Sequence, residues 1–194
     1  ITVIDPAESP WLDDFSATYF EKRKAKGITE DQARKDMSHV LRFGAMMVKK
    51  GFADSMVAGA ENTTGDVLRA GLTVIGTAPG SKTASSCFVM DLKNDAWGAG
   101  GLLIFSDCAV IPTPTSEQLA DIAVSAAKSC REFSGAEPVV ALLSFSTRGS
   151  GGKDENVLRV QEAVALLRER NPGFLFDGEM QLDAALVQIG RAHV

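Results

Sequence analysis

The sequence predicts an α/β protein built from parallel strands flanked by helices. Short runs of nearly continuous apolar residues alternate with longer segments whose apolar residues recur at helical spacing. Such runs are typical of parallel strands that are buried on both faces. Hydrophobic residues make up 45% of the 194 residues, which is enough to bury a sizeable core. This length is compatible with one large domain or with two small ones.

The first part of the chain, residues 1–80, reads as the end of a first α/β domain. Strands are predicted over residues 1–5 and 55–59, and helices over residues 11–26, from residue 29, over residues 38–50, and in a segment that includes residues 67–75. Thr29 with Gln32 has the form of a capping box. Pro79-Gly80 then breaks the pattern, so we place a domain boundary there.

Residues 81–188 are predicted to form most of a second α/β domain. Strands are expected over residues 85–92, 101–105, 139–145 and 174–176, and helices over residues 115–132 and 154–170. Thr115 with Gln118 makes a second capping box at the start of the first of these helices. The strands alternate with helices, which favours a parallel sheet covered on both faces.

Charge and composition exclude several classes of partner. The chain has 20 Lys and Arg against 25 Asp and Glu, a formal charge of −5, which is the wrong sign for a nucleic-acid-binding protein. Cys87, Cys108 and Cys130 are too few and too widely spaced for a disulfide framework or a zinc site. No run reaches the roughly 18 apolar residues of a membrane span. We therefore expect a cytoplasmic protein without metal, nucleic-acid or membrane partners.

Polar segments that follow predicted strands are the candidate ligand sites, since ligands bind outside the carboxyl ends of parallel strands. These segments are Asn62-Thr63-Thr64, Asp107, residues 146–152 and Asp177-Gly178-Glu179. Asn62, Thr63 and Thr64 precede a helix N-terminus, which favours an anion. The alternative is that Thr63 or Thr64 simply caps the helix.

Arginine is the other candidate for binding an anion. Arg69 lies in an apolar stretch of the same helix, and its guanidinium suits phosphate oxygens. Spacing alone places Arg23 in a solvated basic helix end, and His39 reads as a core or surface histidine. Residues 146–152 resemble a glycine-rich phosphate loop but lack the Walker A and dinucleotide patterns, so they could equally be a flexible connection.

A series of ordered segments resembles the phosphate acetyltransferase family, over residues 1–187. The segments are Phe20–Gly27, Met56–Ala60, Asn62–Thr64, Asp66–Arg69, Thr77–Gly80, Phe105–Val110, Leu143–Thr147 and Asp177–Gln181. The resemblance implies two Rossmann-like α/β/α domains with a cleft between them, both incomplete here. It also implies reversible acetyl transfer between coenzyme A and inorganic phosphate, with no bound cofactor or metal and a homodimeric parent protein.

The resemblance assigns roles to residues as well. Arg23 and Arg69 correspond to active-site arginines of the family, and Asn62, Thr63, Thr64, Ser146 and Thr147 are expected to bind substrate. The family's catalytic Asp and Ser-Arg pair have no match in this chain, so we expect the chain alone to be inactive. Phosphate butyryltransferase is one alternative, and a non-catalytic acetyl-CoA-sensing domain of a malic enzyme is another.

The last six residues have a separate explanation. Residues 189–194 are the translation of ATCGGAAGAGCACACGTC, a common sequencing adapter, so we read them as read-through. The alternative is that the preceding helix continues. His193 then has no role, which leaves His39 as the one candidate histidine.

Overall fold

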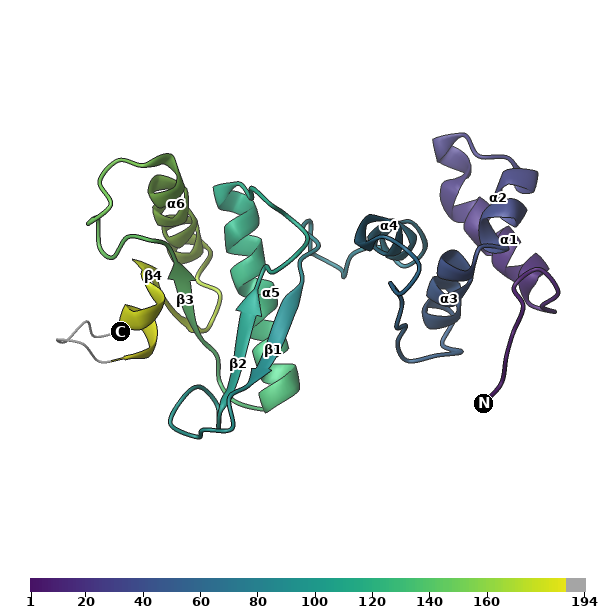
Figure 1. Ribbon diagram of the computed structural model, residues 1–194. Helices are drawn as coiled ribbons and strands as arrows, with labels where there is room; N and C mark the ends of the chain where they lie inside the picture. The colour runs from purple at the N-terminus through teal and green to yellow at the C-terminus, as the bar shows by residue number, and fades with distance from the viewer. Residues whose placement is uncertain (188–194) are drawn as a thin grey trace. The chain divides into compact units, whose positions relative to one another are not determined.

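The chain divides into two compact units, which a computed structural model describes over residues 1–187 (Figure 1). Unit 1 comprises Ile1–Ala78 and unit 2 begins at Pro79, two residues before Ser81, where the second domain was predicted to begin. The predicted read-through at residues 189–194 lies outside the described residues. That the two units are parts of two Rossmann-like domains stays a prediction.

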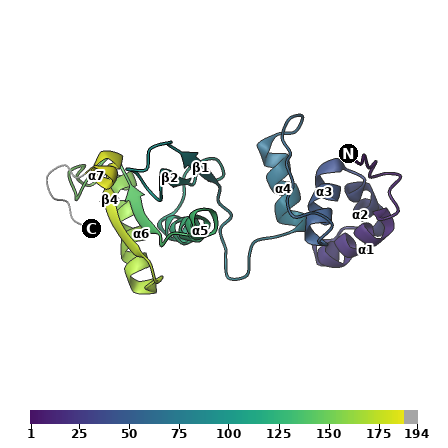
Figure 2. The same ribbon diagram turned by 90° about the horizontal axis from the view of Figure 1, so that it is seen from below.

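Unit 1 is helical. Its elements are α1 (Leu12–Arg23), the short 3-10 helix η1 (Lys24–Lys26), α2 (Glu30–Met37), α3 (Val40–Lys49) and α4 (Thr64–Val74). Gly27 follows η1 and ends this helical segment with φ 83°, a left-handed conformation that suits glycine. α1 packs on α2 and α3 packs on α4, as the view from below shows (Figure 2).

The core of unit 1 is built from large apolar side chains on α1, α2 and α3. Phe15, Met37 and Met46 are fully buried, and burying a side chain of this size stabilises the fold by roughly 1.5–3 kcal/mol. Lys22 of α1 ties this core to α4, because its Nζ donates to the carbonyl oxygens of Val74, at 2.6 Å, and Ile75, at 3.0 Å. A cation is favourable at this helix end.

Two strands predicted within unit 1 are wrong. Residues 1–5 and 55–59 form no strand, and Val57 is 99% exposed. A strand needs a neighbouring strand to satisfy its backbone hydrogen bonds. The described residues of unit 1 contain no strand that could serve as that neighbour. The α/β class is confirmed for the chain as a whole, and every strand belongs to unit 2 within the part of the chain that the structure describes.

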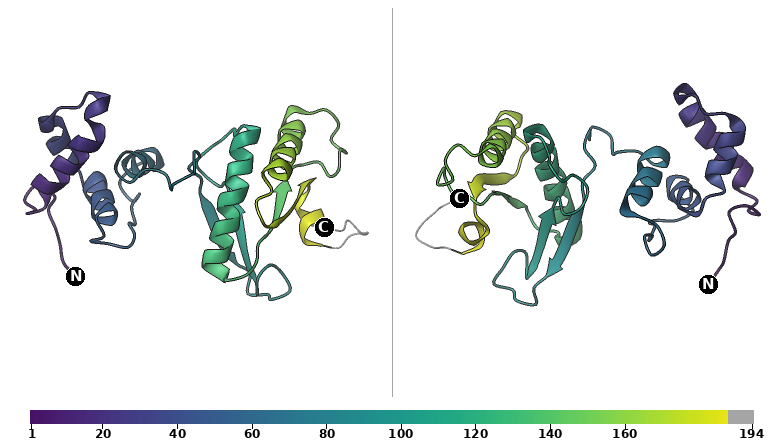
Figure 3. Two further views of the ribbon diagram at one scale, coloured as in Figure 1. Left: turned by 180° about the vertical axis from the view of Figure 1, so that it is seen from behind. Right: turned by 45° about the horizontal axis from the view of Figure 1, so that its top comes forward.

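Unit 2 carries the strands. Its elements are β1 (Cys87–Asp91), β2 (Leu102–Ser106), α5 (Ser116–Ser134), β3 (Val139–Leu143), α6 (Glu155–Arg170), β4 (Leu175–Met180) and α7 (Leu182–Leu186). α5 lies along the β1–β2 hairpin and also contacts β3 and α6, while α6 covers β3 and β4 (Figure 3). The predicted capping box of α5 is confirmed, with both reciprocal bonds between Thr115 and Gln118 present.

The pairing of the strands is mixed, which corrects the prediction of parallel pairing throughout. β1 and β2 pair antiparallel, with Cys87 opposite Ser106. Only the ten residues 92–101 separate them, and parallel strands need a longer crossover. β3 and β4 pair parallel, as predicted, with α6 as the crossover helix.

The strands are also less buried than predicted. Val139 of β3 is 65% exposed, and four of the five residues of β1 are exposed. β4 runs through Asp177 to Met180, so the segment predicted to follow a strand lies inside one. None of the helices that the structure describes is long and apolar enough to cross a membrane.

Candidate functional site

The loop before α4 forms a compact polar turn. The Thr63 hydroxyl accepts the Asp66 backbone N–H at 3.2 Å and donates to the Asp66 carboxylate at 2.7 Å. Thr63 is therefore the N-cap of α4, which was the alternative that the sequence left open. Thr64 is the first residue of the helix and is exposed, and Asn62 is half-buried.

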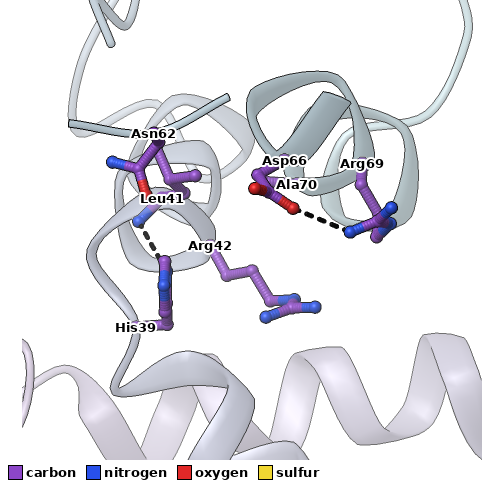
Figure 4. A pocket seen from close by; sticks show the side chains of 7 residues that line it. All are labelled: His39, Leu41, Arg42, Asn62, Asp66, Arg69 and Ala70. Atoms are coloured by element: carbon purple, nitrogen blue, oxygen red, sulfur yellow. Dashed lines mark hydrogen bonds and ion pairs between the residues drawn. The ribbon is translucent and has the colours of Figure 1, made fainter. Parts of the chain in front are cut away.

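A pocket of about 190 Å³ lies beside this turn (Figure 4). Its lining residues come from α3, from the residues before it, and from α4 with its preceding loop: His39, Leu41, Arg42, Asn62, Asp66, Arg69 and Ala70. Two of the seven predicted site residues, Asn62 and Arg69, meet here. The pocket therefore combines two guanidinium groups, one carboxylate and one amide.

Arg69 is held in place by Asp66. Its guanidinium donates to the Asp66 carboxylate at 2.8 Å, an i,i+3 pair on α4. The hydrogen bond from the Thr63 hydroxyl, together with this guanidinium, holds the pKa of Asp66 below its usual value. A guanidinium has five N–H donors, so Arg69 can still bind an anion while it contacts Asp66. The Arg69 side chain is 64% exposed, so the donors that do not contact Asp66 are accessible to a ligand.

Arg23 does not line this pocket. It is the last residue of α1 and is half-buried, and its Nε has no hydrogen-bond partner among the described residues. Burial lowers the pKa of neighbouring Lys22, and repulsion from Lys49 and Arg23 lowers it further. Arg23 is thus one of a group of cations, but the structure does not bring it together with Arg69 in one pocket.

His39 contributes a polar edge to the pocket. It precedes α3 rather than lying on it, and its Nδ1 accepts the Leu41 backbone N–H at 3.3 Å. When Nδ1 accepts, the neutral ring carries its proton on Nε2 and can donate from there. The prediction of a core or surface histidine missed this capping role.

Residues 146–152 in unit 2 form a closed loop rather than an open anion cradle. Each of their seven backbone N–H groups donates to an acceptor within the unit. The acceptors are side chains or carbonyl oxygens of residues 144–150 and 179. An anion cradle needs free amides, and this loop has none to offer.

Glu179 is the anchor of this loop. Its carboxylate is buried, and it accepts the Ser146 hydroxyl at 2.8 Å, the Gly149 N–H at 2.7 Å and the Gln161 amide at 3.0 Å. Burial alone would raise the pKa of Glu179, but these hydrogen bonds outweigh it and lower the pKa. Glu179 is thus ionised and shapes the loop.

Ser146 and Thr147, both predicted substrate contacts, have engaged hydroxyls. Ser146 is fully buried and also accepts the Gly151 N–H at 2.9 Å. The Thr147 hydroxyl accepts the Gln181 N–H at 2.9 Å. Ser146 therefore supports the loop from within, while Thr147 is half-buried at its surface.

Two features of the site were missed from the sequence. Arg42 lies in an apolar helical stretch between Leu41 and Phe43, the same signal that singled out Arg69. The role of Glu179 depends on contacts from residues 18 to 33 positions away, which no local pattern shows. Among the described residues, no group of three or more His, Cys, Asp or Glu could hold a metal ion.

Solved structures share the fold of this chain at substantial identity. A phosphotransacetylase from Streptococcus pyogenes superposes with a TM-score of 0.84 at 40% identity, over 96% of this chain and 55% of that one. A phosphotransacetylase from Staphylococcus aureus gives a TM-score of 0.77 at 41% identity, with the same coverage. Both likenesses extend across the two units.

Curated sequences give the same result. A phosphate acetyltransferase from Treponema pallidum is 67% identical over 189 residues, which are 96% of this chain and 56% of that protein. One from Clostridium acetobutylicum is 46% identical over 184 residues, 95% of this chain and 55% of that protein. The chain thus spans about half the length of the curated relatives it matches. The family model described as phosphate acetyl/butaryl transferase matches residues 1–194, and the chain belongs to that family.

Proposed function

We propose that the whole protein containing this chain transfers an acetyl group between coenzyme A and inorganic phosphate. The observation that carries the proposal is the arginine-lined pocket at Asn62 and Arg69, in a chain 67% identical to a phosphate acetyltransferase. The names of the relatives favour the acetyltransferase over the butyryltransferase, and over a non-catalytic domain of a malic enzyme.

The proposed reaction places an anion next to a carbonyl group that itself becomes an oxyanion. A phosphate oxygen attacks the thioester carbon, the C–S bond breaks, and the proton from phosphate goes to the departing thiolate. The products are acetyl phosphate and free coenzyme A. Fixed cations and hydrogen-bond donors that face the developing charge contribute several kcal/mol to such a step. Holding the two substrates together lowers the barrier further.

The pocket residues have proposed roles that follow from their contacts. Arg69 binds a phosphoryl group with the donors that Asp66 leaves free, and Asn62 donates its side-chain amide. Thr64 is exposed and available, whereas Thr63 acts through the α4 cap. Arg23 neutralises substrate charge from its position at the end of α1.

The two residues of unit 2 are proposed to act differently from each other. Thr147 contacts substrate at the loop surface, and Ser146 positions the loop through its bonds to Glu179 and Gly151. Coenzyme A and phosphate are the substrates, and the reaction uses no bound cofactor or metal. A cytoplasmic location and a homodimeric assembly stay predictions.

The experiment is turnover of acetyl phosphate by the whole protein, followed as loss of the coenzyme A thiol. Arg69→Gln is expected to lower kcat/KM by about 10²–10³, because removing one donor to a developing charge has this effect. Arg34→Gln is the matched control, since Arg34 makes an exposed ion pair with Asp13 and should change the rate by no more than about twofold. Equal rates for both variants would remove Arg69 from the proposal.

Two further arms of the experiment address the substrate and the chain itself. Butyryl phosphate should react more slowly than acetyl phosphate, and the reverse order would favour the butyryltransferase. We propose that residues 1–194 alone show no thiol loss, because the resemblance places the catalytic Asp and the Ser-Arg pair outside them. Turnover by the purified chain would overturn that point.

A further inference from the structure

We propose that Arg42 is a second phosphoryl-binding arginine of the pocket and, with Arg69, makes it a seat for a single phosphoryl group. This inference rests on the proposed function and deepens it, since the family resemblance singled out Arg23 and Arg69 but gave Arg42 no role. The ligand chemistry is a phosphoryl dianion, supplied either by free phosphate or by a phosphate of coenzyme A.

The first support is the size of the pocket. At about 190 Å³ it is smaller than the roughly 300–1,000 Å³ of sites that enclose a drug-sized ligand. That space accommodates the five heavy atoms of a phosphate group but not a whole coenzyme A molecule.

The second support is the unmet hydrogen bonding of Arg42. Its Nε is buried and has no partner among the described residues, although a buried donor without an acceptor is costly. The Arg42 guanidinium also makes no hydrogen bond to Asp36, because its Nη1 lies 3.8 Å from the Asp36 Oδ1, beyond hydrogen-bond distance. The Arg42 side chain is only 24% exposed, so bulk water does not fully solvate its charge. An anion in the pocket would give the Arg42 guanidinium the acceptor that it lacks.

The third support is the direction and balance of charge. Figure 4 shows Arg42 reaching from α3 and Arg69 from α4, with His39 below them and Asp66 paired to Arg69. The Asp66 carboxylate already accepts from the Thr63 hydroxyl and the Arg69 guanidinium, so its charge is compensated. The residues that line the pocket therefore carry two guanidinium groups and one carboxylate, and the second nearby carboxylate, that of Asp36, does not line it and lies 3.8 Å from Arg42.

Binding of inorganic phosphate to the whole protein that contains this chain tests the proposal, measured by calorimetry or by phosphorus NMR. Arg42→Gln is expected to weaken phosphate binding by on the order of tenfold or more, since a hydrogen bond to a charged group contributes that much. Asp36→Asn breaks the same ion pair from the other side. It should bind phosphate as tightly as the unmodified protein or more tightly, because it removes a competing carboxylate.

The outcomes separate binding from a merely structural role. Equal weakening by Arg42→Gln and Asp36→Asn would mean that Arg42 acts only through Asp36, and would overturn the proposal. Unchanged phosphate binding by Arg42→Gln would also overturn it, as would the absence of phosphate binding by the unmodified whole protein. Should Arg42→Gln fail to fold, Arg42→Lys decides: it keeps the charge but loses the planar fork, so weaker binding is expected and unchanged binding would overturn the proposal.

Titrations with coenzyme A distinguish the two sources of the phosphoryl group. If coenzyme A supplies it, Arg42→Gln weakens coenzyme A binding and phosphate competes with coenzyme A. If free phosphate supplies it, Arg42→Gln leaves coenzyme A binding unchanged. Either result supports a phosphoryl ligand at Arg42. Arg69→Gln and the turnover assay test the proposed function separately. If Arg69→Gln loses phosphate binding and Arg42→Gln does not, the role of Arg42 is rejected and the proposed function stands.

Discussion

At the scale of single residues, the structure separates the side chains that are free to bind a ligand from those engaged in holding the fold. Arg69 keeps most of its donors, whereas the hydroxyls of Thr63 and Ser146 are committed to neighbouring groups. The sequence could predict that a hydroxyl stands before α4, because capping is a local effect. It could not predict that Ser146 is buried, because Glu179 lies 33 positions away.

Ser146→Ala tests the buried network directly. The substitution leaves the Gly151 N–H without its acceptor and removes one donor from Glu179, so unfolding should become easier by about 1–3 kcal/mol. Denaturant unfolding measures the change. Lys153→Ala is the control beside the same loop, because the Lys153 side chain is exposed and its loss should change the free energy of unfolding by no more than about 0.5 kcal/mol. Equal effects would show that the network adds no stability.

At the scale of elements, helices were predicted more accurately than strands. Helix ends carry local signals, such as the capping box at Thr115 and the left-handed Gly27. A strand depends on a partner that may be distant, so the apolar run at residues 55–59 was misread where unit 1 offers none. The antiparallel order of β1 and β2 follows from the short connection between them, which the predicted strands at residues 85–92 and 101–105 already implied.

The turn after β2 is held by one carboxylate, that of Asp107. It accepts the Ser86 N–H at 2.8 Å and the Ile111 N–H at 2.7 Å, and it also accepts the Ser86 hydroxyl. Burial alone would raise the pKa of Asp107, but these hydrogen bonds outweigh it and lower the pKa to about 2. The ionised carboxylate is therefore the form that stabilises unit 2.

Asp107→Asn should lower the free energy of unfolding by about 2 kcal/mol at pH 7, because the pKa falls by nearly two units on folding. The folded pKa lies below the unfolded value of 3.8, so the stabilisation is complete above about pH 4 and is lost as the pH falls toward 2. Unfolding measured from pH 7 to pH 2 should show the two proteins converging in acid. Asp95→Asn is the control, because Asp95 is exposed. A difference in the free energy of unfolding between Asp107→Asn and the unmodified protein that stays constant with pH would contradict this account.

At the scale of the whole molecule, the two units differ in architecture. Unit 1 holds the arginine-lined pocket on a helical scaffold, and unit 2 holds a hydrogen-bonded loop beside a parallel strand pair. The family is evident from both, since the likeness to solved phosphotransacetylases covers 96% of the chain. The pattern of apolar runs predicted the α/β class, and the acidic charge favours partners other than nucleic acid, which stays a prediction. Only ordered motifs such as Asn62 to Arg69 indicated the chemistry.

The most direct test of the central claim is exchange of labelled phosphate into acetyl phosphate, catalysed by the whole protein with coenzyme A. Exchange requires that phosphate and the acetyl thioester react reversibly at one site. We predict that the label enters acetyl phosphate only when coenzyme A is present, and that Arg69→Gln slows its entry by about 10²–10³. Exchange that proceeds without coenzyme A, or at full rate in Arg69→Gln, would contradict the claim that this chain carries the phosphate site of an acetyltransferase.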